Sequence, residues 1–272
     1  MFGMLNNQNN YAKLEIKYFN FLKKLSFKIN KFYTKNSHLK NLVYNKKTIK
    51  FDPVTKLDKK FEELIRKEIK INFKKHNIIG EEFGNDKEKS EYNWIIDPID
   101  GTKSLIAGNP TWSNLIGLDY KDKPIIGLAN FPELNKFYLA KKNLGYVFFR
   151  KNKKKLKVSS NKNFKNIKIA GAMTCFLNFR KKKNLRKLTN IIQFHSFDSL
   201  SIGNFCEGKI DAVIGCGNKS WDIHPWVPII KSAGGFISNW KGEQVDKGGN
   251  ILISNNLINH KKIINKIQKI LY

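Results

Sequence analysis

The stretch WIIDPIDGT (residues 94–102) joins a short apolar run to two aspartates, a tight turn and a threonine. The apolar run has the length of a buried strand, so the acidic residues follow at its carboxyl end, where open α/β sheets form their ligand crevices. Pro98 fixes its own φ and Gly101 permits a tight turn, so Asp97 and Asp100 can converge instead of pointing to opposite faces. Two carboxylates that meet at one point repel each other unless cations lie there. Hard divalent ions such as Mg²⁺ prefer oxygen ligands, so we expect a metal site at this turn.

Other acidic residues strengthen this interpretation, although each has a simpler explanation alone. An isolated D-x-x-D pattern is also typical of turn aspartates that bond to local amides. Glu81 and Glu82 follow a second apolar run, residues 78–80, whereas Asp222 and Asp52 could each be a helix cap or a turn residue. Their occurrence together, in a chain with only 22 acidic residues, favours one shared site.

The segment 101–104, Gly-Thr-Lys-Ser, predicts an anion pocket beside this acidic group. We expect it to open a short helix, whose free N–H groups and positive dipole end suit a phosphate. Hydrolysis of phosphate monoesters is among the slowest uncatalysed reactions, and metal ions accelerate it by activating water and neutralising charge on the oxygens. A cation cluster next to an anion pocket therefore indicates a metal-dependent phosphatase.

Hydrophobic periodicity predicts a mixed α/β fold in which helices cover sheets. Apolar residues at helical spacing predict helices over 11–34 and 58–75, the second with Asp58 as its N-cap. Short apolar runs predict strands at 94–96, 115–118, 125–129, 137–140 and 146–149. The polar, lysine-rich connector 150–166 is the best candidate for an internal boundary. Beyond it we expect strands at 167–172, 210–214, 236–238 and 251–254, and helices over 181–194, 199–207, 222–232 and 256–271.

Composition leaves two interpretations of the charge open. The 272 residues include 51 lysines and arginines against 22 acidic residues, a formal net charge of +29, and basic surfaces are typical of nucleic-acid binders. However, arginine, whose planar fork reads base edges, occurs only at Arg66, Arg150, Arg180 and Arg186. Abundant Lys, Asn, Ile and Phe are what A+T-rich codons favour, so we interpret the charge as compositional drift. We do not expect specific nucleic-acid recognition.

Cysteine content and hydropathy predict the compartment. The three cysteines form no C-x-x-C pair, which argues against a disulfide scaffold and a thiolate zinc site. Residues 1–10 are polar and resemble no secretory signal, and no apolar run approaches the roughly 18 residues of a membrane helix. We expect a soluble cytoplasmic protein without a membrane partner.

Taken in order along most of the chain, these motifs resemble the inositol monophosphatase family of magnesium-dependent, lithium-sensitive phosphatases. The matching segments are Asp52-x-Val54-Thr55-x-x-Asp58, Gly80-Glu81-Glu82, residues 94–102, Trp221-Asp222 and Ser232-Ala233-Gly234-Gly235. The resemblance implies a layered α-β-α-β-α sandwich, as in the fructose-1,6-bisphosphatases, and commonly a homodimer. It also implies a single catalytic domain over 1–272, with most metal ligands in 1–150 and Asp222 and the substrate-side residues in 151–272.

The resemblance also implies roles for individual residues. The ligands of two or three Mg²⁺ ions would be Glu81, Asp97, the carbonyl of Ile99, Asp100 and Asp222. Thr102 and Asp52 would orient the attacking water, and Glu81 would help to deprotonate it. Asp100 and the amides of Gly101 and Thr102 would bind the phosphate. The activated water would then attack phosphorus in line, without a phosphoenzyme.

The substrate is indicated by two further features. The segment after Thr102, residues 103–118, resembles the histidinol-phosphatase branch of the family more than its inositol branch. Inositol-specific members place a glutamate seven residues before the last metal aspartate, where this chain has Gly215. We therefore expect hydrolysis of L-histidinol phosphate, whose ammonium and imidazole groups would need acidic or aromatic partners. Candidates are Glu207, Trp112 and Trp226, each equally consistent with packing.

Alternatives stay open at this stage. The nearest enzymatic ones are an inositol-1-monophosphatase or a broad sugar-phosphate phosphatase, and after them a 3′-phosphoadenosine-type nucleotidase, all acting on a small phosphorylated metabolite. An alternative of another class is a basic RNA- or ribonucleoprotein-binding protein that retains the phosphatase fold. His195 and His224 are better interpreted as surface or packed residues than as ligands or bases.

Overall fold

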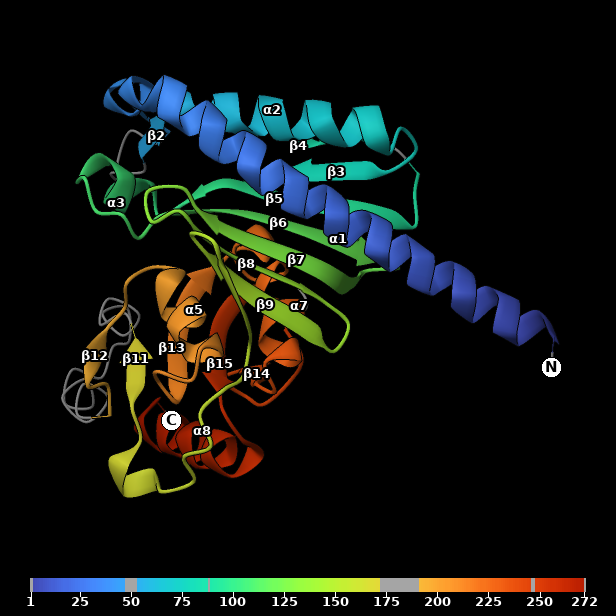
Figure 1. The fold of residues 1–272 in the computed structure, drawn as a ribbon. Helices are drawn as coiled ribbons and strands as arrows, with labels where there is room; N and C mark the ends of the chain where they lie inside the picture. The colour runs from blue at the N-terminus through green and yellow to red at the C-terminus, as the bar shows by residue number, and fades with distance from the viewer. Residues whose placement is uncertain (1, 47–52, 88, 172–190, 246–247, 272) are drawn as a thin grey trace.

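The structure is a computed structural model that describes residues 2–46, 53–87, 89–171, 191–245 and 248–271 (Figure 1). Its elements form five layers. Helices α1 (Phe2–Asn36) and α2 (Lys56–Asn72) cover one face of an eight-stranded sheet. Helices α5 (Leu200–Cys206) and α7 (Trp226–Ser232) lie between this sheet and a five-stranded one, whose outer face is covered by α8 (Leu257–Leu271). This is the α-β-α-β-α sandwich that the sequence led us to expect.

The eight-stranded sheet is antiparallel except for one parallel pair, β3 with β5. Its strand order is β10 (Asn152–Lys155), β9 (Leu144–Phe149), β8 (Lys136–Lys141), β7 (Lys123–Phe131), β6 (Ser113–Tyr120), β5 (Tyr92–Asp100), β3 (Asn77–Gly80) and β4 (Gly84–Asn85). All five strands predicted for this half lie within observed strands. The segment predicted as a polar connector over 150–166 contains a strand at 152–155, where it pairs with β9 as an exposed edge strand. Edge lysines discourage further strand pairing, which explains how so polar a segment can be a strand.

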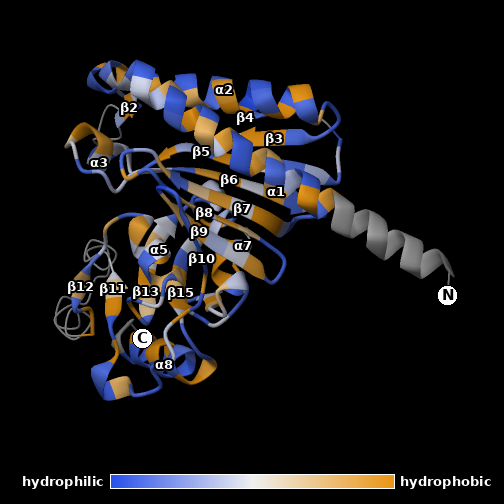
Figure 2. Cartoon of the chain, viewed as in Figure 1, coloured by the Kyte–Doolittle hydropathy of each residue, from blue (hydrophilic) through white to orange (hydrophobic). Residues whose placement is uncertain are grey.

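The helices of the first layer bury one face each. In α2, Leu57, Phe61, Ile65 and Ile69 are fully buried at helical spacing, and the charged residues other than Asp58 and Glu62 are not buried. Figure 2 shows hydrophobic and hydrophilic residues interspersed along α2 and along the coloured part of α1, as expected of helices that contact a sheet and solvent. The predicted N-cap Asp58 is wrong, because the helix begins at Lys56 with Thr55 as its cap.

The five-stranded sheet has the order β12 (Phe194–His195), β11 (Ile169–Gly171), β13 (Ala212–Asn218), β15 (Gly249–Ser254) and β14 (Phe236–Asn239). The helix predicted over 181–194 lies mostly outside the described residues, and its end is wrong because Phe194 pairs with β11 as a strand. The helix predicted over 222–232 is two helices, α6 (Ser220–Ile223) and α7, which meet at His224 and Pro225. Proline lacks the amide that a continuing helix needs, so it separates them.

Three short elements complete the description. Strands β1 (Val43–Asn45) and β2 (Pro53–Thr55) form a two-stranded sheet, and α3 (Thr102–Ile106) follows the turn at Gly101. Single 3₁₀ turns occur at Ser37–Asn41 and Phe164–Asn166. Among the described residues, no helix combines the length and the apolar character needed to cross a bilayer.

Candidate active site

Three aspartate carboxylates lie close together: two come from the eight-stranded sheet and one from the helix that follows β13. Asp97 and Asp100 lie at the end of β5, and Asp222 lies on the single-turn helix α6. One carboxylate oxygen from each falls within 4.8 Å of the others. Asp97 is only 2% exposed, and its Oδ1, like Oδ2 of Asp100, is buried without a hydrogen-bond partner among the described residues. Buried carboxylate oxygens without donors are costly, so the arrangement calls for a cation.

A β-bulge makes the convergence possible. Side chains three positions apart on a regular strand point to opposite faces. In the pairing of β5 with β6, Asp97 is opposite Leu115 and Asp100 is opposite Ser113, so β5 carries one extra residue in this interval. The side chain of Asn114 donates to the carbonyl of Pro98 over 2.6 Å and holds the bulge. Pro98 cannot donate to a ladder, which favours irregular pairing here.

Burial and the crowding of negative charge raise the pKa values of all three aspartates. Burial, then the charges of Glu81, Asp100 and Asp222, raise the pKa of Asp97 well above its ordinary value. Burial and the nearby Asp222 raise the pKa of Asp100 to about 8. Burial is also the main reason why the pKa of Asp222 is raised to about 6. Without a bound cation, ionising these groups together is unfavourable, and a divalent cation would reverse that.

Glu81 and Glu82 follow β3 at the same edge of the sheet. The amide of Glu81 donates to the carbonyl of Ile96 over 3.2 Å, which continues the pairing of β3 with β5 and brings Glu81 beside Asp97. The ammonium group of Lys46 lies 2.9 Å from Oε1 of Glu81 and 2.5 Å from Oε1 of Glu82. Burial lowers the pKa of Lys46, but its hydrogen bonds and ion pairs with the two glutamates outweigh this and raise it overall. The sequence analysis missed Lys46, which nothing in its local pattern distinguishes from other lysines.

Thr102 contacts Asp58. Its hydroxyl donates to Oδ1 of Asp58 over 3.3 Å and lies 3.2 Å from the carbonyl of Ile99. The other oxygen of Asp58 accepts from the amide and hydroxyl of Thr55, at 2.7 and 2.5 Å, which closes the capping box of α2. The sequence analysis assigned the partner of Thr102 to Asp52, which lies outside the described residues, so that pairing stays a prediction.

A cavity of about 180 Å³ opens beside the three aspartates, on the side of the five-stranded sheet. Asp100, Asp198, Gly215 and Asp222 are among the residues that line it. Oδ2 of Asp198 accepts from the hydroxyls of Ser104 at 2.5 Å and Thr111 at 2.7 Å. Among the described residues, Oδ1 of Asp198 accepts no hydrogen bond. The sequence analysis missed Asp198, an isolated acid in a turn whose place beside Asp100 depends on how the two halves pack.

The other candidates for substrate contact do not reach this cavity. Glu207 is occupied by Lys136, Tyr138 and Lys209 instead. Trp112 and Trp226 are fully buried, so neither can offer a ring face to a substrate, and the packing interpretation of both is correct. His195 is exposed on β12 and His224 is buried against Asp119, as the sequence analysis favoured.

Comparison with known proteins identifies the family. The sequence pattern of the inositol monophosphatase family matches residues 17–272. The chain belongs to the inositol monophosphatase family. It is 35% identical over 195 residues to a fructose-1,6-bisphosphatase/inositol-1-monophosphatase of Aquifex aeolicus, covering 68% of this chain and 71% of the relative. It is 30% identical over 218 residues to a histidinol-phosphatase of Chlorobaculum parvum, covering 75% and 79%.

Solved structures agree on the fold. The extragenic suppressor protein SuhB of Bartonella henselae superposes with a TM-score of 0.80, at 23% identity, over 92% of this chain and 98% of that protein. As a member of the inositol monophosphatase family, the chain is a phosphoric monoester hydrolase. The family is generally metal-dependent, and the acidic cluster fits that requirement.

Proposed function

We propose that the chain is a Mg²⁺-dependent phosphate monoesterase that prefers L-histidinol phosphate. The proposed metal dependence rests on one observation, the convergence of Asp97, Asp100 and Asp222. Asp97 and Asp100 each have a buried oxygen that lacks a hydrogen-bond donor among the described residues. An all-oxygen, carboxylate-rich donor set suits Mg²⁺ better than softer ions. Because the ligands come from both halves, we propose that 1–272 acts as a single catalytic unit.

Each residue then has a role that its position supports. Asp97, Asp100, Asp222, Glu81 and the carbonyl of Ile99 would hold the ions. Bound Mg²⁺ would acidify water and neutralise charge on the phosphate oxygens. The amides of Gly101 and Thr102 would bind the phosphate at the start of α3, and Asp100 would hold it through a shared ion. Glu81 lies beside Asp97 at the sheet edge, where it could accept a proton from the attacking water.

Thr102 and Asp58 are the water-orienting pair that the contacts favour. The hydroxyl of Thr102 lies between Oδ1 of Asp58 and the carbonyl of Ile99. Burial raises the pKa of Asp58 to about 6, against the hydrogen bonds from Thr55 that lower it. The carboxylate is therefore available as an acceptor above that pH, and Asp52 stays an alternative partner for Thr102.

The preference for a cationic substrate rests on Asp198 and Gly215. An ammonium group on the substrate would meet Oδ1 of Asp198, which accepts no hydrogen bond from the described residues, at the wall of the cavity and within reach of a phosphate held near Asp100. At Gly215 no side chain is present to accept the ring hydroxyls of an inositol. The resemblance to a histidinol-phosphatase of Chlorobaculum parvum supports the same substrate.

A second candidate is hydrolysis of inositol or sugar phosphates. The resemblance to an Aquifex aeolicus protein named for fructose-1,6-bisphosphate and inositol-1-phosphate favours it. The two candidates differ in whether a positive charge on the substrate is needed. A homodimer and a cytoplasmic location stay predictions.

A phosphate-ester panel with Mg²⁺ tests the proposal. We expect the highest kcat/KM with L-histidinol phosphate, and lower values with inositol-1-phosphate and glycerol phosphate. Asp198→Asn should lower kcat/KM for histidinol phosphate by about 10- to 100-fold, the value of one charge-assisted hydrogen bond, but change that for glycerol phosphate by less than about threefold. Asp97→Asn is the matched control and should remove turnover of every substrate. Equal turnover of inositol and histidinol phosphates, unaffected by Asp198→Asn, would overturn the substrate preference. Full turnover in EDTA would overturn the metal dependence.

A further inference from the structure

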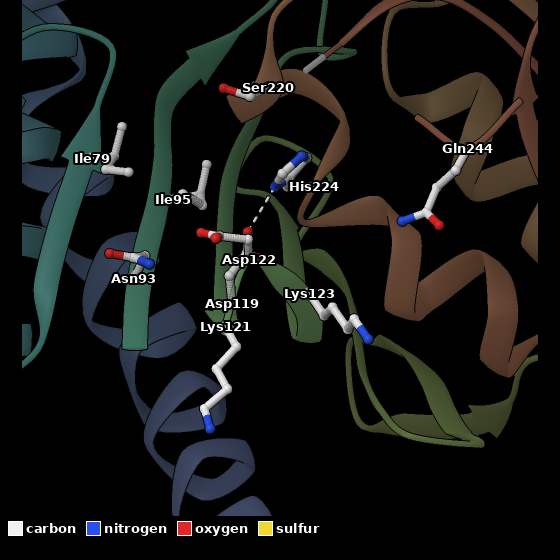
Figure 3. A pocket seen from close by; sticks show the side chains of 10 residues that line it. All are labelled: Ile79, Asn93, Ile95, Asp119, Lys121, Asp122, Lys123, Ser220, His224 and Gln244. Atoms are coloured by element: carbon white, nitrogen blue, oxygen red, sulfur yellow. Dashed lines mark hydrogen bonds and ion pairs between the residues drawn. The ribbon is translucent and has the colours of Figure 1, made fainter. Parts of the chain in front are cut away.

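A buried aspartate–histidine pair lies behind the candidate active site. Nδ1 of His224 is 2.8 Å from Oδ2 of Asp119, although 105 residues separate them in the chain. Asp119 is 3% exposed and His224 is 8% exposed. Both line a cavity of about 690 Å³ between the eight-stranded sheet and α6, and Figure 3 shows the bond crossing from the sheet to the helix. The proposed function gives this pair no role.

The pair is attached to one candidate metal ligand through α6. This helix has four residues, and isolated helices shorter than about 12 residues are marginal in water, so its position depends on tertiary contacts. Asp222 lies within it and His224 follows directly after it as the C-cap. The amide of Lys219 donates to Oδ2 of Asp222 over 2.7 Å at the start of the helix. The bond from His224 to Asp119 then holds its end.

The other partner is attached to the strands that carry the remaining ligands. Asp119 lies on β6, opposite Asn93 of β5, and β5 continues to Asp97 and Asp100. The hydrogen bond between Asp119 and His224 therefore links the strand pair that carries two of the carboxylates to the helix that carries the third.

Packing next to His224 confirms how closely the end of α6 meets the sheet. A Cβ added at Gly127 would lie 1.7 Å from the carbonyl oxygen of Pro225, and one added at Gly117 would lie 3.2 Å from its Cα. The glycines of β6 and β7 thus admit the backbone that follows α6. Ser220 and His224, in contrast, line the cavity. The hydrogen bond from His224 to Asp119 is a polar contact between this side of the helix and the sheet.

A purely structural role explains the pair poorly. Burying a carboxylate and an imidazole costs free energy that an apolar pair of similar volume would not. Oδ1 of Asp119 is, in addition, buried without a hydrogen-bond partner among the described residues. A hydrogen-bonded polar pair fixes the relative orientation of its two side chains, which apolar packing does not.

We propose that Asp119 and His224 are positioning residues that hold Asp222 at the distance from Asp97 and Asp100 that a divalent cation requires. This inference rests on the proposed metal site. Residues that orient metal ligands through hydrogen bonds change metal affinity by about 10- to 100-fold when they are removed. The pair should therefore govern Mg²⁺ affinity, and affect turnover at saturating Mg²⁺ much less.

The test compares Mg²⁺ binding in His224→Ala, Asp119→Ala and the double variant. Binding is measured without substrate, by calorimetry and by the Mg²⁺-dependent increase in Tm, and separately by the Mg²⁺ dependence of kcat. We expect each single variant to raise the half-saturating Mg²⁺ concentration by about 10- to 100-fold, with kcat at saturation within about threefold of wild type. The double variant should be no weaker than the weaker single variant, since both remove the same bond. Asp119→Asn, which keeps the shape and a neutral hydrogen bond, should lie between wild type and Asp119→Ala, and it serves if the alanine variant does not fold.

His260→Ala is the matched control. His260 is also a buried histidine, 5% exposed and hydrogen-bonded to Ser238 and Ser254, but it lies in α8, on the outer face of the five-stranded sheet. The His260→Ala variant should have a lower Tm than wild type and the same Mg²⁺ affinity. If His224→Ala and Asp119→Asn lower Tm as His260→Ala does and leave Mg²⁺ affinity within twofold of wild type, the positioning role is wrong while the metal site stands. If wild type shows no Mg²⁺-dependent change in Tm, the proposed function itself is wrong.

Discussion

The hydroxyl of Thr102 donates to Oδ1 of Asp58 over 3.3 Å, although the two residues are 44 positions apart in the chain. Because Oδ2 of the same aspartate closes the capping box of α2 through Thr55, one buried side chain joins the first layer of helices to the turn after β5. The start of α2 and the geometry of the candidate site are therefore coupled. Changes at Asp58 should be visible in both stability and turnover.

Asp58→Asn tests this coupling. Asparagine keeps the shape but accepts more weakly from Thr55 and Thr102, so we expect kcat to fall by about 10²-fold, the value of a positioned proton acceptor, and Tm to fall by several degrees. Turnover of a phosphate ester and thermal unfolding in Mg²⁺ measure the two effects. Thr55→Ala is the control: it removes the cap without touching Thr102, so it should lower Tm with little change in kcat. A variant Asp58→Asn with normal kcat would exclude Asp58 from orienting water.

The convergence of Asp97, Asp100 and Asp222 could be predicted from the sequence because the motifs that carry these residues are largely local. Asp97 and Asp100 lie within one turn motif. Glu81 directly follows the apolar run 78–80, and Asp222 begins the predicted helix 222–232. What the sequence could not give depends on packing between distant segments. Asp198 reaches Asp100 only when the five-stranded sheet is assembled, and the contact of Asp58 with Thr102 depends on how α2 crosses the end of β5.

The predicted element boundaries are wrong where a local feature of the backbone overrides the pattern of apolar and polar residues. Apolar periodicity runs through 222–232, yet Pro225 divides the segment into α6 and α7. Lysines at 153–155 predict a solvated connector, yet the backbone at this edge of the sheet pairs with β9 whatever its side chains are. Hydrophobic periodicity indicates which face of an element is buried. Both errors lie at positions where the backbone conformation does not depend on which side chains are buried.

Asp97→Asn should abolish activity and stabilise the metal-free protein. Loss of a carboxylate ligand costs several kcal/mol of transition-state stabilisation, about 10³-fold or more in kcat. In EDTA at a pH above the raised pKa values of the cluster, however, the substitution removes one of several buried like charges, and relief of about 1–2 kcal/mol would raise Tm by roughly 2–8 °C. Asp86→Asn is the control, because Asp86 is paired with Arg66 at 2.5 Å and Lys70 at 2.8 Å, so its loss should lower Tm. A lower Tm for Asp97→Asn in EDTA would contradict the repulsion that we infer.

The stability of the metal-free protein should decrease with pH. The pKa of Asp100 is raised to about 8 and those of Asp58 and Asp222 to about 6, in each case mainly by burial, whereas an unfolded aspartate titrates near 4. Groups whose folded-state pKa is raised stabilise the fold below the unfolded pKa, and this contribution is lost as pH rises through 6 to 8. Thermal unfolding in EDTA between pH 5 and 8.5 should therefore show a falling Tm.

Mg²⁺ should reverse this trend, because the ion binds the ionised carboxylates and its binding releases protons. The increase in Tm on adding Mg²⁺ should thus grow between pH 6 and 8. Asp100→Asn removes a carboxyl group whose pKa is raised to about 8, so the Tm of this variant in EDTA should depend less on pH than that of wild type. A Tm that rises with pH in EDTA would show that the carboxylates are not crowded in the metal-free state.

Gly101→Ala tests the turn that separates the metal aspartates from α3. Gly101 has φ of 87°, where an L side chain costs about 1–2 kcal/mol, and an added Cβ would lie 3.2 Å from Cγ of Asp198. We expect a fall in Tm of several degrees, and about a tenfold or greater loss of kcat/KM, because the methyl group displaces the carboxylate at the wall of the cavity. Gly108→Ala separates the two causes: Gly108 has φ of 76°, but nothing lies within 4 Å of its added Cβ. It should therefore lose stability to the same extent and keep its kcat/KM. Equal losses of kcat/KM in both variants would mean that backbone strain near α3, and not the contact with Asp198, limits the reaction.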